Sequence, residues 1–125
     1  MNAPINAGVE SAVDELLRSL EPYRVTIQWP DTVRAYLAKY PELIPHVRPT
    51  VESARQEFGD VAGLTLTIND DPEYYDPYLK LYVRLPKYGR EADERLENLT
   101  VPLSEAIADL GGYFRVAADY RNPAR

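Results

Sequence analysis

The stretch that decides the fold is residues 61–85, which read VAGLTLTINDDPEYYDPYLKLYVRL. Apolar and polar residues alternate toward both of its ends, and this period of two is typical of a strand that buries one face. Two such strands, at 61–68 and 78–85, predict a β-hairpin. The leucines and the valine of the second strand then face the core, whereas Lys80, Tyr82 and Arg84 stand on the open face of the sheet.

The loop between these strands, residues 69–77, has the sequence NDDPEYYDP and carries four carboxylates. It is longer than a two-residue hairpin turn, and its charges favour water, so we expect an exposed acidic tip. Carboxylate oxygens are also the ligands that Mg²⁺ and Ca²⁺ prefer. The glycine and the ligand spacing of an EF-hand loop are absent, however, so the sequence favours a solvated loop over a metal site.

Outside the hairpin, helices are predicted where apolar residues recur every three or four positions, and strands where they alternate. The resulting elements are a helix at 9–21, a strand at 23–29, helices at 31–40, 49–58 and 91–110, and a strand at 113–119. Pro41, Pro45 and Pro49 predict a kinked connector between the second and third helices, because proline lacks the amide hydrogen that a helix needs. Pro102 predicts a kink in the last helix.

Capping residues and glycines predict where three of these helices begin or end. Asp31 or Thr32 can accept a backbone N–H at the start of the 31–40 helix. Gly59 is expected to end the 49–58 helix, and Gly111-Gly112 to supply a left-handed cap after the 91–110 helix.

The order of elements after the first helix is β, broken α, β, β, α, β, which matches the split βαβ or ferredoxin-like arrangement. The predicted fold class is therefore α+β, an N-terminal helix followed by a ferredoxin-like βαββαβ domain with a four-stranded, mainly antiparallel sheet and helices on one face. A single domain at 9–120, with its core at 23–120, lies between tails at 1–8 and 121–125. The 9–21 helix docks either on its own domain or in the groove of a partner.

The composition of the 125 residues is that of one compact globular domain, with 45 % hydrophobic and 27 % charged residues. No apolar run approaches the ~20 residues of a membrane-spanning helix, and no signal peptide is recognisable, so we expect a cytoplasmic protein without a membrane partner. Zero cysteines and one histidine exclude disulfides, thiolate chemistry and histidine-rich metal centres. The net charge of −6 disfavours nucleic acid as a partner.

Signals of catalysis are few. His46, the single histidine, follows Pro45 and has no nucleophile or acid at a suggestive spacing. The serines fall on predicted helices, and the chain contains no glycine-rich phosphate loop. We therefore expect a protein that is not an enzyme and that uses no cofactor and no metal.

Tyrosine is the unusual residue of this chain, at ten of 125, and several tyrosines gather around the hairpin. Tyrosine offers a large contact area with few rotatable bonds, and it is enriched at binding surfaces. The sequence thus predicts a non-catalytic protein-binding module, an acidic adaptor or antitoxin-like neutralising subunit that binds a basic protein or a second copy of itself. The predicted contact residues are Asp70, Asp71, Glu73, Tyr74, Tyr75, Asp76, Tyr82 and Arg84.

Two other functions stay open at this point. A small-molecule or single-stranded RNA binding module could use the open sheet face around Lys80, Tyr82 and Arg84, because aromatic and basic residues on strands are the composition that stacks and holds unpaired bases. A metal-assisted hydrolase at the acidic loop 70–76 is the third alternative.

Several short motifs resemble a group of small prokaryotic proteins of unassigned function that share the pattern YLxx(H/Y)PEL, then FG, then DPExxDxYLxLYVR. Here the matching residues begin at Trp29-Pro30 and include YLAKYPEL at 36–43, Phe58-Gly59 and DPEYYDPYLKLYVR at 71–84. Tyr40 stands where that pattern often has histidine. Some of those proteins are encoded beside toxin-like genes, so the resemblance implies an antitoxin-like role; it implies no catalytic residue.

Overall fold

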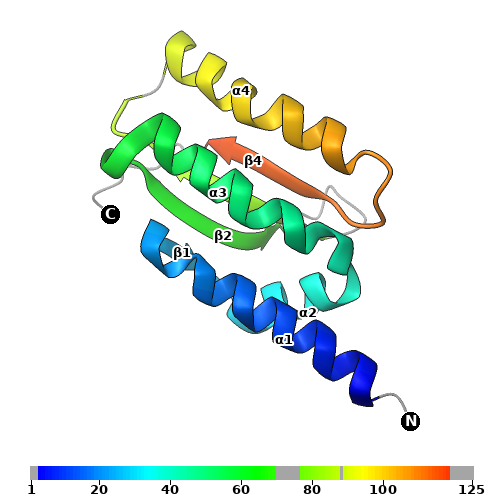
Figure 1. Ribbon diagram of the computed structural model, residues 1–125. Coiled ribbons are helices and arrows are strands. Elements are labelled where there is room, and N and C mark those ends of the chain that lie inside the picture. Colours follow the sequence, from blue (N-terminus) through cyan, green and yellow to red (C-terminus); the bar gives the residue numbers. More distant parts are fainter. Residues whose placement is uncertain (1–2, 70–76, 88, 119–125) are drawn as a thin grey trace.

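The computed structural model describes residues 3–69, 77–87 and 89–118, with side chains from residue 8 onward. The helices and strands, in chain order, are α1 (Ala3–Ser19), β1 (Val25–Ile27), α2 (Pro30–Lys39), α3 (Ile44–Phe58), β2 (Gly63–Asn69), β3 (Tyr78–Arg84), α4 (Arg90–Ile107) and β4 (Phe114–Ala118). Three short 3-10 helices link them: η1 (Glu21–Tyr23), η2 (Pro41–Leu43) and η3 (Gly59–Val61). Helices α1, α3 and α4 lie on one side of the sheet (Figure 1). The α+β class and the four-stranded sheet are thus confirmed.

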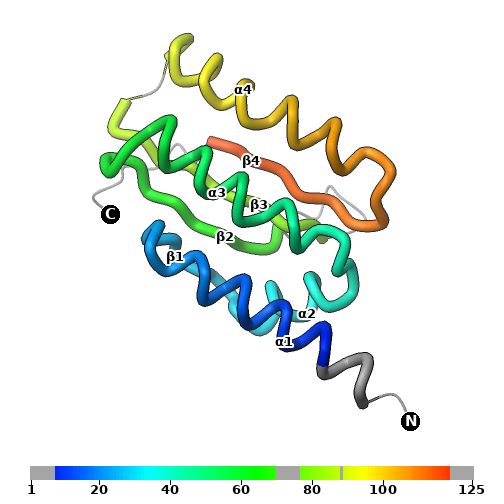
Figure 2. The backbone as a smooth tube through the Cα atoms, viewed as in Figure 1, coloured from blue at the N-terminus to red at the C-terminus, as the bar shows by residue number. Residues whose placement is uncertain are grey.

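The strands follow one another across the sheet in chain order, β1-β2-β3-β4 (Figure 2). The hairpin partners β2 and β3 are antiparallel, whereas β1 is parallel to β2 and β3 is parallel to β4. The prediction of a mainly antiparallel sheet is therefore wrong. The ferredoxin-like order is not confirmed either, because each helical crossover returns the chain to the neighbouring position in the sheet, with no strand inserted between the two that it joins.

The hydrophobic core lies between the sheet and the helices. The strand residues that alternate toward the helices are buried: Leu64, Leu66, Ile68, Leu79, Leu81, Val83, Phe114 and Val116. Helix α1 joins the same core through Val13 and Leu16, Leu20 does so directly after it, and α1 contacts α2 and α3. The first helix thus docks on its own domain. It begins at Ala3, inside the stretch that the sequence assigns to a tail.

Strand β1 has three residues, although the alternation of apolar residues predicts seven. The backbone enters the left-handed region immediately before it at Arg24 (φ 55°) and two residues after it at Trp29 (φ 55°), and this conformation ends an extended segment. Helix α2 then starts with Pro30 in its first turn, where the missing N–H costs no helical bond. No side chain caps this helix, so the predicted cap at Asp31 or Thr32 is wrong.

Pro49, where the sequence predicts a connector, and Pro102, where it predicts a kink, both lie inside continuous helices. Helix α3 starts at Ile44 and runs through Pro49, and α4 runs through Pro102. Both prolines are exposed. The carbonyl that each ring leaves unpaired is one turn earlier on the same side of the helix, where water can pair with it. The predicted connector is reduced to η2.

Glycine is required at Gly59 by the backbone conformation and at Gly112 by the space available. Gly59 has φ +69° and ends α3, as predicted. The predicted left-handed cap at Gly111-Gly112 is wrong, since Gly59 has the one positive glycine φ in the described chain. Gly112 is needed for space, because a Cβ there would lie 2.7 Å from Leu43 and 2.8 Å from Tyr40.

Arg55 ties the start of the sheet to the end of α3. Its guanidinium donates to the carbonyl of Tyr23 at 2.8 and 3.1 Å, to that of Gly59 at 2.7 Å and to that of Ala62 at 2.9 Å. Burial and the nearby Arg24 lower the pKa of Arg55, while Asp60 opposes the shift. Arginine stays protonated at neutral pH despite such a shift, so all of these donors remain available.

No helix within 3–69, 77–87 or 89–118 is both long and apolar enough to cross a membrane.

Candidate functional site

The face of the sheet opposite the core carries a polar and basic surface. Strand alternation directs every second residue to this open face, and the strand register lines these residues up in rows. One row joins Thr67 of β2, Lys80 of β3 and Arg115 of β4. The rows on either side pair Thr65 with Tyr82 and Asn69 with Tyr78. We call the central group the open-face cluster; its members are Thr67, Asn69, Tyr78, Lys80, Tyr82 and Arg115.

Lys80 lies between two tyrosine rings. Its Nζ is 4.7 Å from the ring centre of Tyr82 and 5.7 Å from that of Tyr78, and it donates to the Tyr82 hydroxyl at 3.3 Å. The ring of Tyr78 is itself fixed edge-on by Tyr113, with centres 5.3 Å apart. Cation–π contacts of this kind hold the ammonium without neutralising it. The two rings and the Tyr82 hydroxyl therefore hold Lys80 on the open face.

Neither Lys80 nor Arg115 has a carboxylate at ion-pair distance in the described part of the chain. Elsewhere cations do find acids: Arg34 pairs with Asp14 between α2 and α1, and Arg95 binds Glu57 at 2.8 Å between α4 and α3. These two pairs join helices. The open-face cations are thus available to a charge on a partner.

Two polar atoms beneath this surface have no hydrogen-bond partner. Thr67 is 3 % exposed, and its Oγ1 neither donates nor accepts a hydrogen bond. Asn69, two residues along the same strand and on the same face, leaves its Nδ2 buried and unpaired. Buried polar groups are nearly always paired in folded proteins. Two unpaired ones beside an unneutralised lysine make this cluster unusual.

The acidic residues of the described chain lie off the strands. Each acidic residue of the described chain lies on a helix, on a 3-10 helix or in the turn after α4, and none lies on a strand. The strands carry only cations, namely Lys80, Arg84 and Arg115. The net charge of −6 therefore describes the helical side better than the open face.

The predicted contact residues divide into two groups. Tyr82 and Arg84 lie half-buried on β3, with their side chains on the open face, as the alternation indicates. The acidic loop residues and the two tyrosines among them, Asp70, Asp71, Glu73, Tyr74, Tyr75 and Asp76, lie outside the described residues. Thr67, Asn69 and Arg115 were missed, because their proximity to Lys80 depends on strand register and parallel pairing that the local pattern does not contain.

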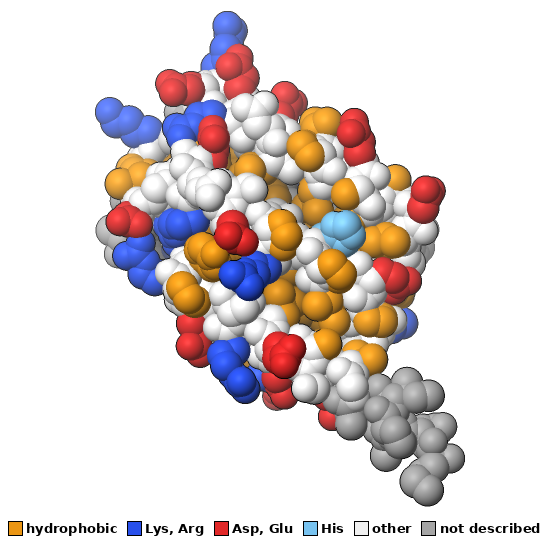
Figure 3. All heavy atoms as spheres, viewed as in Figure 1, with side chains coloured by type: hydrophobic (Ala, Val, Ile, Leu, Met, Phe, Trp, Pro, Cys, Tyr) orange, Lys and Arg blue, Asp and Glu red, His pale blue; other side chains and the backbone are white. Residues whose placement is uncertain are grey.

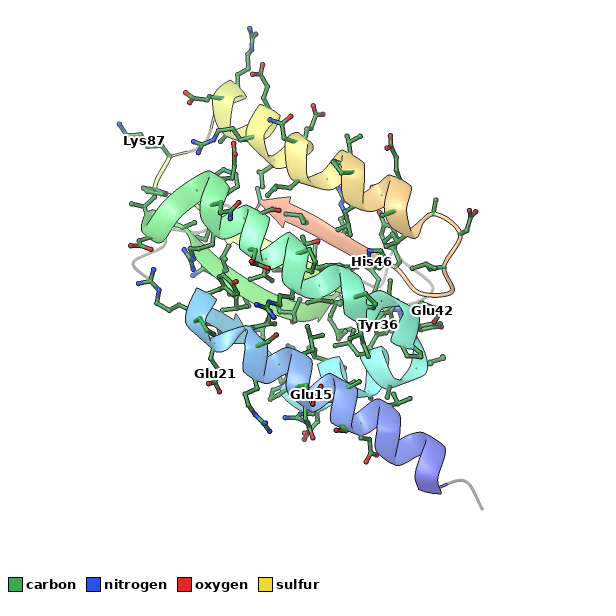
Figure 4. The ribbon with its side chains drawn as sticks, in the orientation of Figure 1. Glu15, Glu21, Tyr36, Glu42, His46 and Lys87 are labelled. Carbon is green, nitrogen blue, oxygen red and sulfur yellow. The ribbon has the colours of Figure 1, made fainter. Side chains whose placement is uncertain are left out.

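A hollow of about 230 Å³ lies between α1 and α2 and is lined by Glu10, Asp14 and Arg34 among others. Two more hollows lie further along the helical side. One, of about 220 Å³, lies between α3 and α4 and is lined by His46, Pro49 and Pro102 among others. His46 is visible there with apolar side chains around it (Figure 3), and it projects from the first turn of α3 (Figure 4). The other hollow, of about 530 Å³, lies at the start of α4 near Phe58, Leu85 and Arg95. None of these hollows combines charged groups with unpaired polar atoms as the open face does.

No group of three or more histidine or carboxylate side chains that could hold a metal ion occurs within the described ranges. No protein-family model, no curated protein and no solved structure matches this chain.

Proposed function

We propose that this protein is a non-catalytic binding module that holds single-stranded RNA on the open face of its sheet. The observation that carries the proposal is the row Thr67–Lys80–Arg115, which is free of acids and lies between tyrosines. Unpaired bases stack on aromatic side chains, and phosphates pair with nearby cations. A sheet face offers both at once, because rows of side chains on neighbouring strands lie about 5 Å apart.

The overall acidity of the chain limits but does not forbid this function. Exposed charges more than about a Debye length apart are screened at physiological salt, so the acids on the helices act weakly on a ligand at the other side of the sheet. Lys80 and Arg115, if each meets one phosphate, predict a modest salt dependence. The slope of log affinity against log salt should be about −1.4 for a single strand.

The test is the affinity for a labelled, unstructured oligouridine, measured by fluorescence anisotropy at two salt concentrations. The Lys80→Glu/Arg115→Glu variant should lose binding, because it reverses both unpaired cations of the row. The matched control is Arg18→Glu/Lys39→Glu on α1 and α2, which changes the net charge by the same amount on other elements. Equal losses in both variants, or equal binding of a double-stranded RNA of the same length, would contradict the proposal.

A second candidate is the acidic adaptor, an antitoxin-like subunit that neutralises a basic protein. The four carboxylates at residues 70–76 support it, because a run of charges of one sign complements a basic partner. Here the partner-binding loop would be 70–76. Its Asp70→Asn/Asp71→Asn variant should lose a stoichiometric protein that co-purifies from the native lysate at low salt. The control, Glu94→Gln/Glu97→Gln on α4, should retain it; equal retention by both variants would exclude the loop.

A further inference from the structure

We infer that the open-face cluster contains a phosphate-binding site formed by Thr67 Oγ1, Asn69 Nδ2 and Lys80 Nζ, with Arg115 at its rim. The inference deepens the proposed function and rests on it, since the phosphate is then one of the RNA backbone. The same chemistry would also fit free phosphate or the phosphate of a mononucleotide. The experiment below separates these three sources.

The hydroxyl of Thr67, the side-chain amide of Asn69 and the ammonium of Lys80 can all donate hydrogen bonds. The Asn69 Nδ2 and the Lys80 Nζ can only donate, and the Thr67 hydroxyl can donate as well. The Nδ2 and the hydroxyl are unpaired, and the ammonium uses one of its three hydrogens on the Tyr82 hydroxyl. A ligand that brings several acceptor oxygens is therefore the missing partner.

The strand register places these donors at neighbouring positions on one face of the sheet. Thr67 and Lys80 are directly opposite on antiparallel strands, where Cβ atoms lie about 5 Å apart. Asn69 is two residues along β2 on the same face, roughly 7 Å away. Arg115 follows Lys80 in the same row on β4. Donors at three neighbouring strand positions suit a tetrahedral oxyanion, because its oxygens point in different directions, whereas the two oxygens of a carboxylate lie in one plane.

The contrast with Thr50 shows that the unpaired state of Thr67 is specific to this face. Thr50 and Thr67 are the two polar residues buried in the described chain. The Thr50 hydroxyl donates to the carbonyl of His46 at 2.7 Å, so its burial is satisfied inside α3. Thr67 has no such neighbour. Its hydroxyl is shielded from water as well, and a bound phosphate would remove this unfavourable condition.

Lys80 is the open-face residue directly opposite the buried hydroxyl of Thr67, and its side chain can move. Lys80 faces Thr67 across the strands, and its four-carbon stem is flexible. A single 3.3 Å hydrogen bond and two ring contacts hold its ammonium. A phosphate attracted by Lys80 and Arg115 can therefore draw the lysine aside and reach the hydroxyl and the amide beneath.

The experiment follows the side-chain amide of Asn69 in proton–nitrogen correlation NMR spectra. The ¹⁵N-labelled protein is titrated with inorganic phosphate, uridine monophosphate or oligouridine, against sodium chloride of equal ionic strength. We expect saturable shifts of the Asn69 side-chain signals with each phosphate ligand and none with chloride. Thr67→Val and Lys80→Gln should each weaken phosphate binding by about tenfold, the effect of one hydrogen bond to a charged group.

Two matched controls separate the site from general effects. Thr50→Val removes the other buried threonine hydroxyl, and Lys39→Gln removes a lysine that also lies over a tyrosine, 5.4 Å from the ring of Tyr40. Both should leave phosphate binding unchanged. Asn69 signals that respond no more to phosphate than to chloride, or equal weakening in the control variants, would overturn the phosphate site.

The outcomes also distinguish the two proposals. If oligouridine binds while Thr67→Val leaves its affinity unchanged and phosphate shifts nothing, the phosphate site is wrong and the RNA-binding function stands. If phosphate or uridine monophosphate binds in the predicted way and oligouridine does not, the site is correct for a small ligand and the RNA-binding function is wrong.

Discussion

Replacing Thr67 by valine should make the free protein more stable. The residue is 3 % exposed, and its hydroxyl has no partner. A buried hydroxyl without a hydrogen bond costs about 1–3 kcal/mol. Valine has the same branched shape and a comparable preference for strands, so the substitution removes that cost without leaving a cavity. We expect the free energy of unfolding to rise by about 1–2 kcal/mol.

The corresponding change in melting temperature can be worked out from the chain length. At about 2.1 cal/mol/K per residue, 125 residues have an unfolding entropy of roughly 260 cal/mol/K. The melting temperature of Thr67→Val should therefore rise by about 4–8 °C. Urea unfolding followed by circular dichroism measures the free energy, and an unchanged slope with urea shows that the unfolded state is the same.

The control for this prediction is Thr50→Val, which removes a hydroxyl that donates a 2.7 Å hydrogen bond to the carbonyl of His46. Its free energy of unfolding should stay the same or fall by about 1 kcal/mol. The reasoning is refuted if Thr67→Val lowers the free energy of unfolding as much as Thr50→Val does. The Thr67 hydroxyl must then contribute a hydrogen bond in the folded state. A gain in stability together with weaker phosphate binding would indicate a polar group kept for function.

Two further substitutions test the fold. Gly112→Ala should lower the melting temperature, because the new Cβ would lie 2.7 Å from the Leu43 side chain. Overpacking of this kind typically lowers the free energy of unfolding by about 1–3 kcal/mol. If differential scanning calorimetry finds no decrease in melting temperature, the loop around Gly112 shifts freely. Arg55→Met keeps the apolar stem but removes the guanidinium bonds to Tyr23, Gly59 and Ala62, and it should cost about 2–3 kcal/mol in urea unfolding. An Arg55→Lys variant as stable as the wild type would show that a single charge, without the forked geometry, is sufficient.

The hairpin illustrates what the local pattern can predict. The alternation in 78–85 assigns each side chain of β3 to a face, and the structure has Leu79, Leu81 and Val83 fully buried as predicted. Lys80, Tyr82 and Arg84 are each half-buried on the other face. This part of the prediction succeeds because a strand has a period of two whatever it pairs with.

The prolines illustrate where the local pattern misleads. Pro49 and Pro102 each remove a helical hydrogen bond, and a break or a kink at each is the reasonable expectation. Helices α3 and α4 nevertheless continue through them, because apolar residues on both sides of each proline are buried against the sheet, as Val47, Val51 and Leu103 are. Tertiary packing outweighs the loss of one bond.

The sequence by itself determined the α+β class, the hairpin and the face on which each residue of β3 lies, because strand and helix periods are local properties of the chain. Only the tertiary structure decided that β1 and β4 pair in parallel with their neighbours, since strand pairing joins segments far apart along the chain. The candidate site likewise contains a part that the sequence predicts and a part that depends on strand pairing. Lys80 and Tyr82 could be assigned to an open face from their spacing, but the row that joins Lys80 to Thr67 and Arg115 exists only after three strands have come together.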